Sequence, residues 1–147
     1  MGVGKPITYE RLADIFKELE EKGAENINLV TPSHYWHAVI RALEIYKPDI
    51  PIVYNTGGYD TVNAVRALKG YIDIYLTDLK YLTADRAKIY SGAENYPEYA
   101  AASIAEEYKQ QPVCVFKNGI MQKGLIIRHL LLPQGTNEAI RVFDWVR

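Results

Sequence analysis

The sequence contains little of three things that would place a protein in a special class. It has a single cysteine, Cys114, which cannot form an internal disulfide and cannot by itself hold a metal cluster. No apolar run approaches the roughly 18 residues of a membrane-spanning helix. No basic block stands out, and 17 basic and 18 acidic side chains leave a formal net charge of −1. Nucleic acids and anionic membranes bind concentrated cationic faces, so we expect neither as a partner.

What is present is the composition of an ordinary soluble domain. Of the 147 residues, 48% are hydrophobic and 24% are charged, which is enough apolar material for a real core. No linker, low-complexity tract or internal repeat is visible, so residues 1–147 are predicted to form one domain. The single cysteine and the absence of a secretory signal favour a reducing, cytoplasmic setting.

Helical and extended patterns alternate along the chain. Helices are predicted between Thr8 and Gly23, between Ser33 and Lys47, and over residues 61–68 (capped by Asp60), 84–90, 96–110 and 137–145. Strands are predicted at 27–30, 52–55, 71–79, 112–116 and 124–133, the last two joined by a turn at Asn118-Gly119. This alternation is typical of an α/β fold with a parallel sheet flanked by helices. We expect all five strands to be parallel, in chain order, and curved like part of a barrel.

The order of the elements is unusual at its start, because a regular α/β unit begins with a strand and this chain begins before a helix. We therefore expect a barrel fragment that is missing its first strand. The strand at 27–30 would then be an unprotected edge, and such edges pair or aggregate, so self-association is expected.

Polar residues follow the predicted strands, where the carboxyl ends of parallel strands meet at one face and sites are built. They are Thr31, Asn55, Asp78, Lys80, Arg128 and His129. In "DIYLTDLKY", Asp78 and Lys80 share a face if the strand continues through them. Such a lysine could be a Schiff-base nucleophile, an ion-pair partner or a clamp for a ligand carboxylate, and a simple surface ion pair is the alternative.

Three further features of the sequence bear on possible sites. Arg128 and His129 interrupt the apolar run "LIIRHLLLP", and burying them without purpose would cost several kcal/mol. His34 and His37 lie three apart on a helix, but no carboxylate has a spacing suited to zinc, so no metal ligand is predicted. Cys114 alternates with valines in "PVCVF" and is predicted to be a small hydrophobe in a buried strand.

Four segments together resemble one family, the radical S-adenosylmethionine proteins related to pyruvate formate-lyase activating enzyme. These segments are "GAENINLVTPSHYWHAVIRAL", "PIVYNTGGY", "YIDIYLTDLKY" and "IIRHLLLPQGTNEAIRVFDWV", in this order. The resemblance implies a partial (β/α)6 barrel with a 4Fe–4S cluster and S-adenosylmethionine at its mouth. It also implies an oxidoreductase parent of the activase type, which cleaves S-adenosylmethionine reductively and acts on a glycyl radical enzyme as its protein substrate.

The resemblance implies roles for individual residues. Asn55 matches the polar residue that helps to hold the methionine amino group. Asp78 and Lys80 match a "DLK" pair at the ribose and methionine, while Arg128 and His129 match polar positions near adenine or substrate. The segment from Thr31 to His34 occupies the place of the family's glycine-rich segment and departs from its "GGE" pattern.

The family's CxxxCxxC loop, which binds the cluster, is absent from this sequence together with the strand before it. We therefore expect this chain to be a central fragment that binds no cluster, contains no catalytic residue and is inactive by itself. Two other hypotheses stay open. One is a non-catalytic binding or assembly module formed by a truncated barrel, and the other is an aldolase-like barrel in which Lys80 forms the Schiff base.

Overall fold

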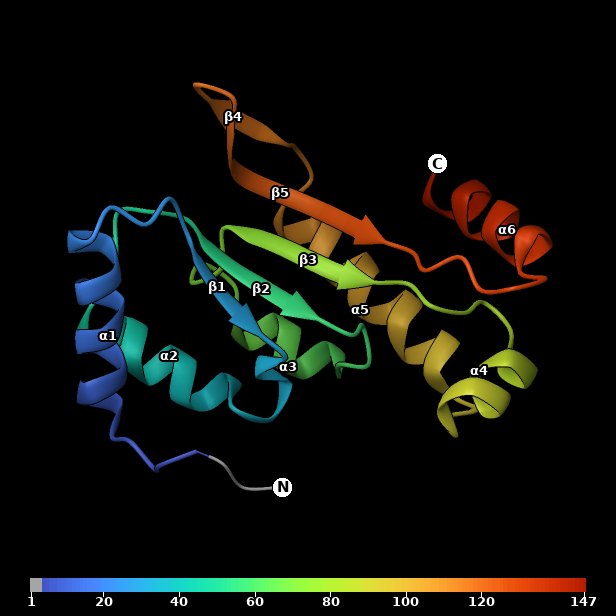
Figure 1. The fold of residues 1–147 in the computed structure, drawn as a ribbon, viewed down its shortest axis with the longest axis horizontal. Helices are drawn as coiled ribbons and strands as arrows, with labels where there is room; N and C mark the ends of the chain where they lie inside the picture. Colours follow the sequence, from blue (N-terminus) through green and yellow to red (C-terminus); the bar gives the residue numbers. More distant parts are fainter. Residues whose placement is uncertain (1–3) are drawn as a thin grey trace.

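The structure, a computed structural model, describes residues 4–147 and is built around one five-stranded sheet (Figure 1). The strands are β1 (Ile27–Val30), β2 (Ile52–Thr56), β3 (Ile74–Asp78), β4 (Val115–Lys117) and β5 (Ile120–Arg128), in the spatial order β1-β2-β3-β5-β4. The helices are α1 (Tyr9–Glu21), α2 (Trp36–Ile45), α3 (Val62–Ala67), α4 (Ala84–Ser91), α5 (Tyr96–Gln110) and α6 (Thr136–Val146), with a short 3-10 helix η1 (Pro32–His34).

Four of the five strands, β1, β2, β3 and β5, are parallel neighbours, as the alternating pattern predicts. A helical crossover separates each from the next, which returns the chain in the same direction. The prediction of five parallel strands in chain order was wrong for β4, which is antiparallel to β5 and lies at the edge of the sheet, so that β5 and not β4 is the neighbour of β3. Asn118 and Gly119 join these two strands and have φ angles of 52° and 80°. So short a turn can only reverse the chain.

The hairpin also overturns the prediction for Cys114. It precedes β4 instead of lying inside a strand, and it is exposed. All of β4 is exposed, because the hairpin extends past the helices that cover the rest of the sheet (Figure 1). The alternation in "PVCVF" therefore marks an edge hairpin and not a buried strand.

The two faces of the parallel strands have different surroundings. Tyr54 and Tyr75 pair in the register and lie at the centre of the core, packed with residues from α1, α2 and α3. The opposite face carries one row of paired residues, namely Val30, Asn55, Leu76 and Ile126. Val30 is 69% exposed, so at β1 this face is open. The fold is thus mixed α/β, with its main helical layer on one side (Figure 1).

Two helix starts differ from their predictions. Ser33 lies in η1, and α2 begins only at Trp36. Thr61 caps α3 in place of Asp60, its hydroxyl accepting a hydrogen bond from the amide of Ala64 at 3.3 Å. Asp60 cannot act as the cap because its carboxylate is buried and accepts hydrogen bonds from the hydroxyls of Tyr54 and Thr56.

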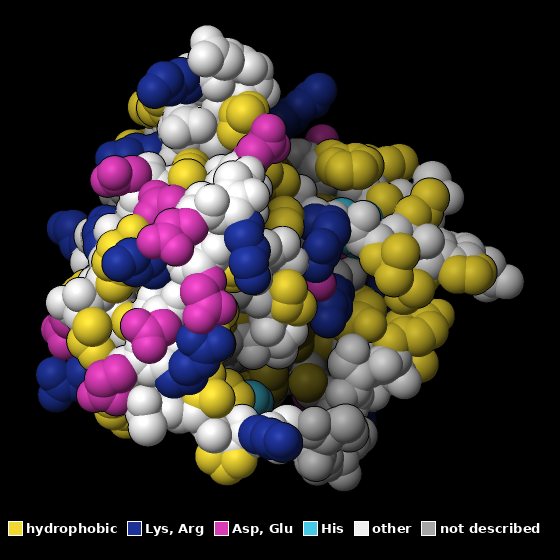
Figure 2. All heavy atoms as spheres, turned by 60° about the vertical axis from the view of Figure 1, so that its left-hand side comes forward, with side chains coloured by type: hydrophobic (Ala, Val, Ile, Leu, Met, Phe, Trp, Pro, Cys, Tyr) yellow, Lys and Arg dark blue, Asp and Glu magenta, His cyan; other side chains and the backbone are white. Residues whose placement is uncertain are grey.

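Within residues 4–147, no helix combines the length and apolar character required to cross a bilayer. On the face seen in Figure 2, basic and acidic side chains are interspersed and do not gather into one cationic patch.

A second buried carboxylate, Glu107 on α5, lies behind β3 on the helical side. Its Oε2 accepts a hydrogen bond from the hydroxyl of Thr77 at 2.7 Å, and its Oε1 is buried without a hydrogen-bond partner among the described residues. Burial raises the pKa of Glu107 to about 7, and the nearby charge of Asp60 adds to the rise, while the Thr77 hydrogen bond opposes it. Near neutral pH, Glu107 therefore carries a proton in much of the folded population.

The Glu107→Gln variant tests this protonation through stability. The folded pKa of Glu107, about 7, exceeds its ordinary value of 4.5, so the folded state holds the proton more tightly. The resulting stabilisation is complete below pH 4.5 and is lost as the pH rises through 7. Between roughly pH 5 and pH 8 the free energy of unfolding should fall by on the order of 2 to 3 kcal/mol through this group, and Glu107→Gln should abolish that fall. Urea unfolding at both pH values measures it.

The exposed Glu98→Gln variant on the same helix is the matched control and should keep the pH dependence of the wild type. An unchanged pH dependence in Glu107→Gln would show that Glu107 is ionised in the fold.

Candidate functional site

Four polar side chains from three adjacent parallel strands lie together at the carboxyl end of the sheet. Asn55 is near the end of β2, while Asp78 and Arg128 are the last residues of β3 and β5 and pair in the register. Lys80 follows β3 by two residues. Because side chains alternate between faces, Asn55, Asp78 and Arg128 all belong to the face opposite the main helical layer.

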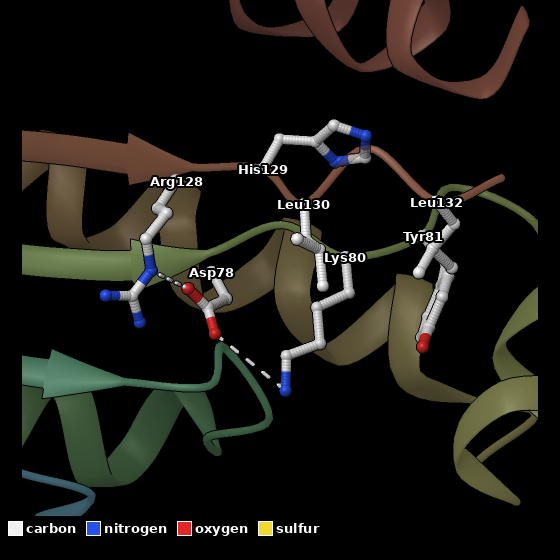
Figure 3. A pocket seen from close by; sticks show the side chains of 7 residues that line it. All are labelled: Asp78, Lys80, Tyr81, Arg128, His129, Leu130 and Leu132. Carbon is white, nitrogen blue, oxygen red and sulfur yellow. Dashed lines mark hydrogen bonds and ion pairs between the residues drawn. The ribbon is translucent and has the colours of Figure 1, made fainter. Parts of the chain in front are cut away.

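Asp78 is the centre of this group, as Figure 3 shows. Its Oδ1 accepts a hydrogen bond from Nε of Arg128 at 2.5 Å, and its Oδ2 lies 3.8 Å from Nζ of Lys80. Nη2 of Arg128 also donates to Oδ1 of Asn55 at 3.4 Å. The hydrogen bond and the charge of Asp78 raise the pKa of Arg128 further above its ordinary value. Two cations around one carboxylate leave a net charge of +1.

The charged groups open onto a pocket of about 270 Å³ between the loops that follow β3 and β5. Its lining residues are Asp78, Lys80, Tyr81, Arg128, His129, Leu130 and Leu132 (Figure 3). Polar groups occupy one part of the wall, and a tyrosine and two leucines occupy another. The side chains of Lys80 and Arg128 are 42% and 52% exposed, so both have N–H groups available for a ligand. Such a wall fits a small molecule with a charged part and a flat or apolar part.

The sequence predicted that His129 lies within a strand. In the structure His129 lies just after the end of β5. Its Nδ1 is 2.7 Å from the carbonyl oxygen of Leu79. A carbonyl can only accept, so Nδ1 carries the hydrogen of this contact. Phe143 of α6 packs against the ring at a centroid distance of 6.1 Å. The expectation that Arg128 is buried was wrong. Its side chain projects from the end of β5 on the face opposite the main helical layer, where it is half exposed.

Thr31 and His34, also predicted to be site residues, are not brought to the pocket. The amide of Thr31 donates to the carbonyl of Asn55 at 2.8 Å, which continues the pairing of β1 with β2. The φ angle of Thr31 is 53°, and the chain turns there into η1. The side chains of Thr31 and His34 are exposed, and neither lines the pocket.

The sequence did not indicate the role of Tyr96, the first residue of α5. Its ring is buried and its hydroxyl lies under the site, within hydrogen-bond distance of the loops after β2 and β3. No sequence signal separates it from the other eleven tyrosines. A glycine at position 58 is a sequence signal that could have indicated the close approach of the loops after β2 and β3. Gly58 has a φ of 79°, and a Cβ there would collide with the carbonyl oxygen of Asp78.

The positions of possible metal ligands can be compared across residues 4–147. No three His, Cys, Asp or Glu side chains in this range are placed to hold a metal ion.

Comparison with known proteins gives one distant similarity. The chain is 26% identical over 146 residues to an uncharacterized protein of Methanocaldococcus jannaschii. The alignment covers 96% of this chain and 38% of that relative, so the chain spans well under half of the relative's length. No protein-family model and no solved structure matches the chain.

The site residues should contribute little to stability, and single alanine variants test this. Lys80→Ala and Arg128→Ala should each lower the free energy of unfolding by no more than about 1 kcal/mol, because half-exposed ion pairs gain little over their hydrated state. Leu79→Ala, from the fully buried residue between Asp78 and Lys80, should cost about 2 to 5 kcal/mol. Urea denaturation gives all three values. A loss for Arg128→Ala as large as that for Leu79→Ala would make the network a structural element.

Proposed function

We propose that this chain is the central part of a radical S-adenosylmethionine barrel, related to pyruvate formate-lyase activating enzyme, and that it holds S-adenosylmethionine. One observation carries the proposal: Asn55, Asp78, Lys80 and Arg128 form one connected network at the carboxyl ends of adjacent parallel strands. In a (β/α) barrel this end of the sheet is where ligands bind. The barrel itself, of which these four parallel strands would be a part, belongs to the same proposal.

The groups of S-adenosylmethionine match the groups of the site. Its carboxylate suits the free N–H groups of Lys80 and Arg128, and its amine and ribose hydroxyls suit the oxygens of Asp78 and Asn55. The apolar part of the pocket wall, from Tyr81 to Leu132, suits a flat base. S-adenosylmethionine supplies a sulfonium carbon–sulfur bond that a one-electron donor can break.

The 4Fe–4S cluster of such enzymes does not fit this chain. A cluster of this kind is held by several thiolates, and the sequence has only Cys114. Cys114 is exposed near the edge hairpin and does not line the pocket. We therefore assign the cluster, the radical chemistry and any glycyl radical partner to a longer parent protein, and only binding of S-adenosylmethionine to these residues.

Titration with S-adenosylmethionine, followed by NMR of the backbone amides, tests the proposal. Without a cluster to bind the amine and carboxylate, we expect a Kd of about 1 mM or weaker. Shifts should be confined to the ends of β2, β3 and β5, and Lys80→Ala should weaken binding about tenfold through the loss of a charged hydrogen bond.

The control is Lys88→Ala, from an exposed lysine of α4 that pairs with Glu94. It should bind like the wild type. Absence of saturable shifts at these strand ends, or equal weakening by Lys88→Ala, would contradict the proposal.

A second candidate function is an assembly module, and the edge of the sheet favours it. Among residues 4–147, β1 is the last strand of the sheet on its side and pairs with β2 alone. Its outer backbone groups and the exposed Val30 form a template on which another strand could pair.

Self-association through this edge is tested by Val30→Lys, since a charged side chain on an edge strand opposes pairing. We expect the wild type to sediment as a dimer or larger species at tens of micromolar, an order-of-magnitude working range. Val30→Lys should be monomeric, and Ile89→Lys, at an equally exposed position on α4, should not change the assembly. A monomeric wild type would remove this candidate.

A further inference from the structure

The loops that follow β2 and β3 are joined beneath the candidate site by one hydroxyl group, that of Tyr96. The Tyr96 oxygen lies 2.8 Å from the carbonyl oxygen of Asp78 and 3.0 Å from that of Gly57. It also accepts a hydrogen bond from the amide of Lys80 at 3.0 Å. A single phenol thus contacts the backbone of both loops, including the backbone of two residues in the charged network.

The surroundings of Tyr96 favour a fixed position for this hydroxyl. The ring is buried and packs edge-on against Tyr81, a pocket residue, at a centroid distance of 5.6 Å. The pKa of Tyr96 is raised, chiefly by burial, so the hydroxyl keeps its proton and can donate while it accepts. The phenol has a single hydrogen to donate, and the carbonyl oxygens of Asp78 and Gly57 are both within reach of it. The phenol oxygen in turn accepts the hydrogen of the Lys80 amide.

Glycines allow the two loops to come this close together. Gly58 has a φ of 79°, and a side chain there would collide with the carbonyl of Asp78. A Cβ on Gly57 would lie 3.5 Å from Nζ of Lys80. The β2 loop therefore passes directly beside the lysine, and the Tyr96 hydroxyl holds that contact from below.

We propose that Tyr96 is the positioning residue of the site, which fixes Lys80 at the mouth of the pocket through its backbone amide. The ligand in this proposal is that of the proposed function, and so its binding test rests on that function. Tyr96 does not line the pocket, and its effect on the ligand must pass through Lys80 and Asp78. Tyr96→Phe removes only the oxygen and keeps the packing of the ring.

Amide hydrogen exchange tests the local part of the proposal without a ligand. In Tyr96→Phe the amide of Lys80 loses its acceptor and should exchange about tenfold faster, the effect of one lost hydrogen bond. The amide of Ile27, which bonds Pro51 far from the site, should exchange as in the wild type. Tyr99→Phe, whose ring packs on Tyr59 of the same aromatic group, is the matched control and should leave Lys80 unchanged. Unaltered exchange at Lys80 in Tyr96→Phe would overturn the proposal.

A double-mutant cycle then tests whether Tyr96 acts through Lys80. Tyr96→Phe should weaken binding of S-adenosylmethionine about three- to tenfold in the wild-type background, the range of one to two hydrogen bonds. In the Lys80→Ala background it should change the Kd by much less, because the residue that it positions is absent. An equal effect in both backgrounds would mean a general structural role and would overturn the proposal. If the wild type binds no S-adenosylmethionine, the proposed function fails, and the exchange of Lys80 alone decides the role of Tyr96.

Discussion

The pairing register of β2, β3 and β5 is the constraint on which the rest of this structure depends. It pairs Asn55 with Leu76 and Asp78 with Arg128, and it pairs Tyr54 with Tyr75 on the opposite face. Side chains alternate along a strand, so a slip of one residue would exchange the two faces. Asp78 would then lie against the helices, and Tyr75 would move to the open face. The burial of apolar side chains on the helical face therefore determines that the charged side chains lie on the opposite face.

The same register places polar groups behind the site as well as in it. Thr56 and Thr77 are paired neighbours, and they contact the buried carboxylates of Asp60 and Glu107. Buried carboxylates are costly unless they are hydrogen-bonded or protonated. Asp60 accepts hydrogen bonds from two hydroxyls, and burial raises the pKa of Glu107 to about 7, so much of Glu107 carries a proton near neutral pH. Both carboxyl groups thus lie behind the ends of β2 and β3, with the charge of Asp78 in front.

Local patterns predicted much of the fold, because apolar periodicity, caps and crossovers are local signals. The bounds of β1 and α5 were predicted to the residue, and the turn at Asn118-Gly119 was found. The direction of β4 was missed because the parallel α/β pattern was extended to it, although the short turn after β4 forces β4 and β5 to run in opposite directions. The proximity of Asp78, Lys80 and Arg128 could be predicted, because parallel neighbouring strands bring their carboxyl ends together. The role of Tyr96 could not be predicted, because it depends on how close the start of α5 lies to the loops after β2 and β3.

The binding of S-adenosylmethionine at this site is tested most directly by a crystal structure of this chain soaked with the ligand. Density for the ligand is expected across the carboxyl ends of β2, β3 and β5. Its methionine carboxylate should lie within hydrogen-bond distance of Lys80 or Arg128, and its base should rest against the wall formed by Tyr81 and Leu132. Clear density for the ligand elsewhere, or an empty pocket at saturating concentration, would show that these residues do not form a site for S-adenosylmethionine.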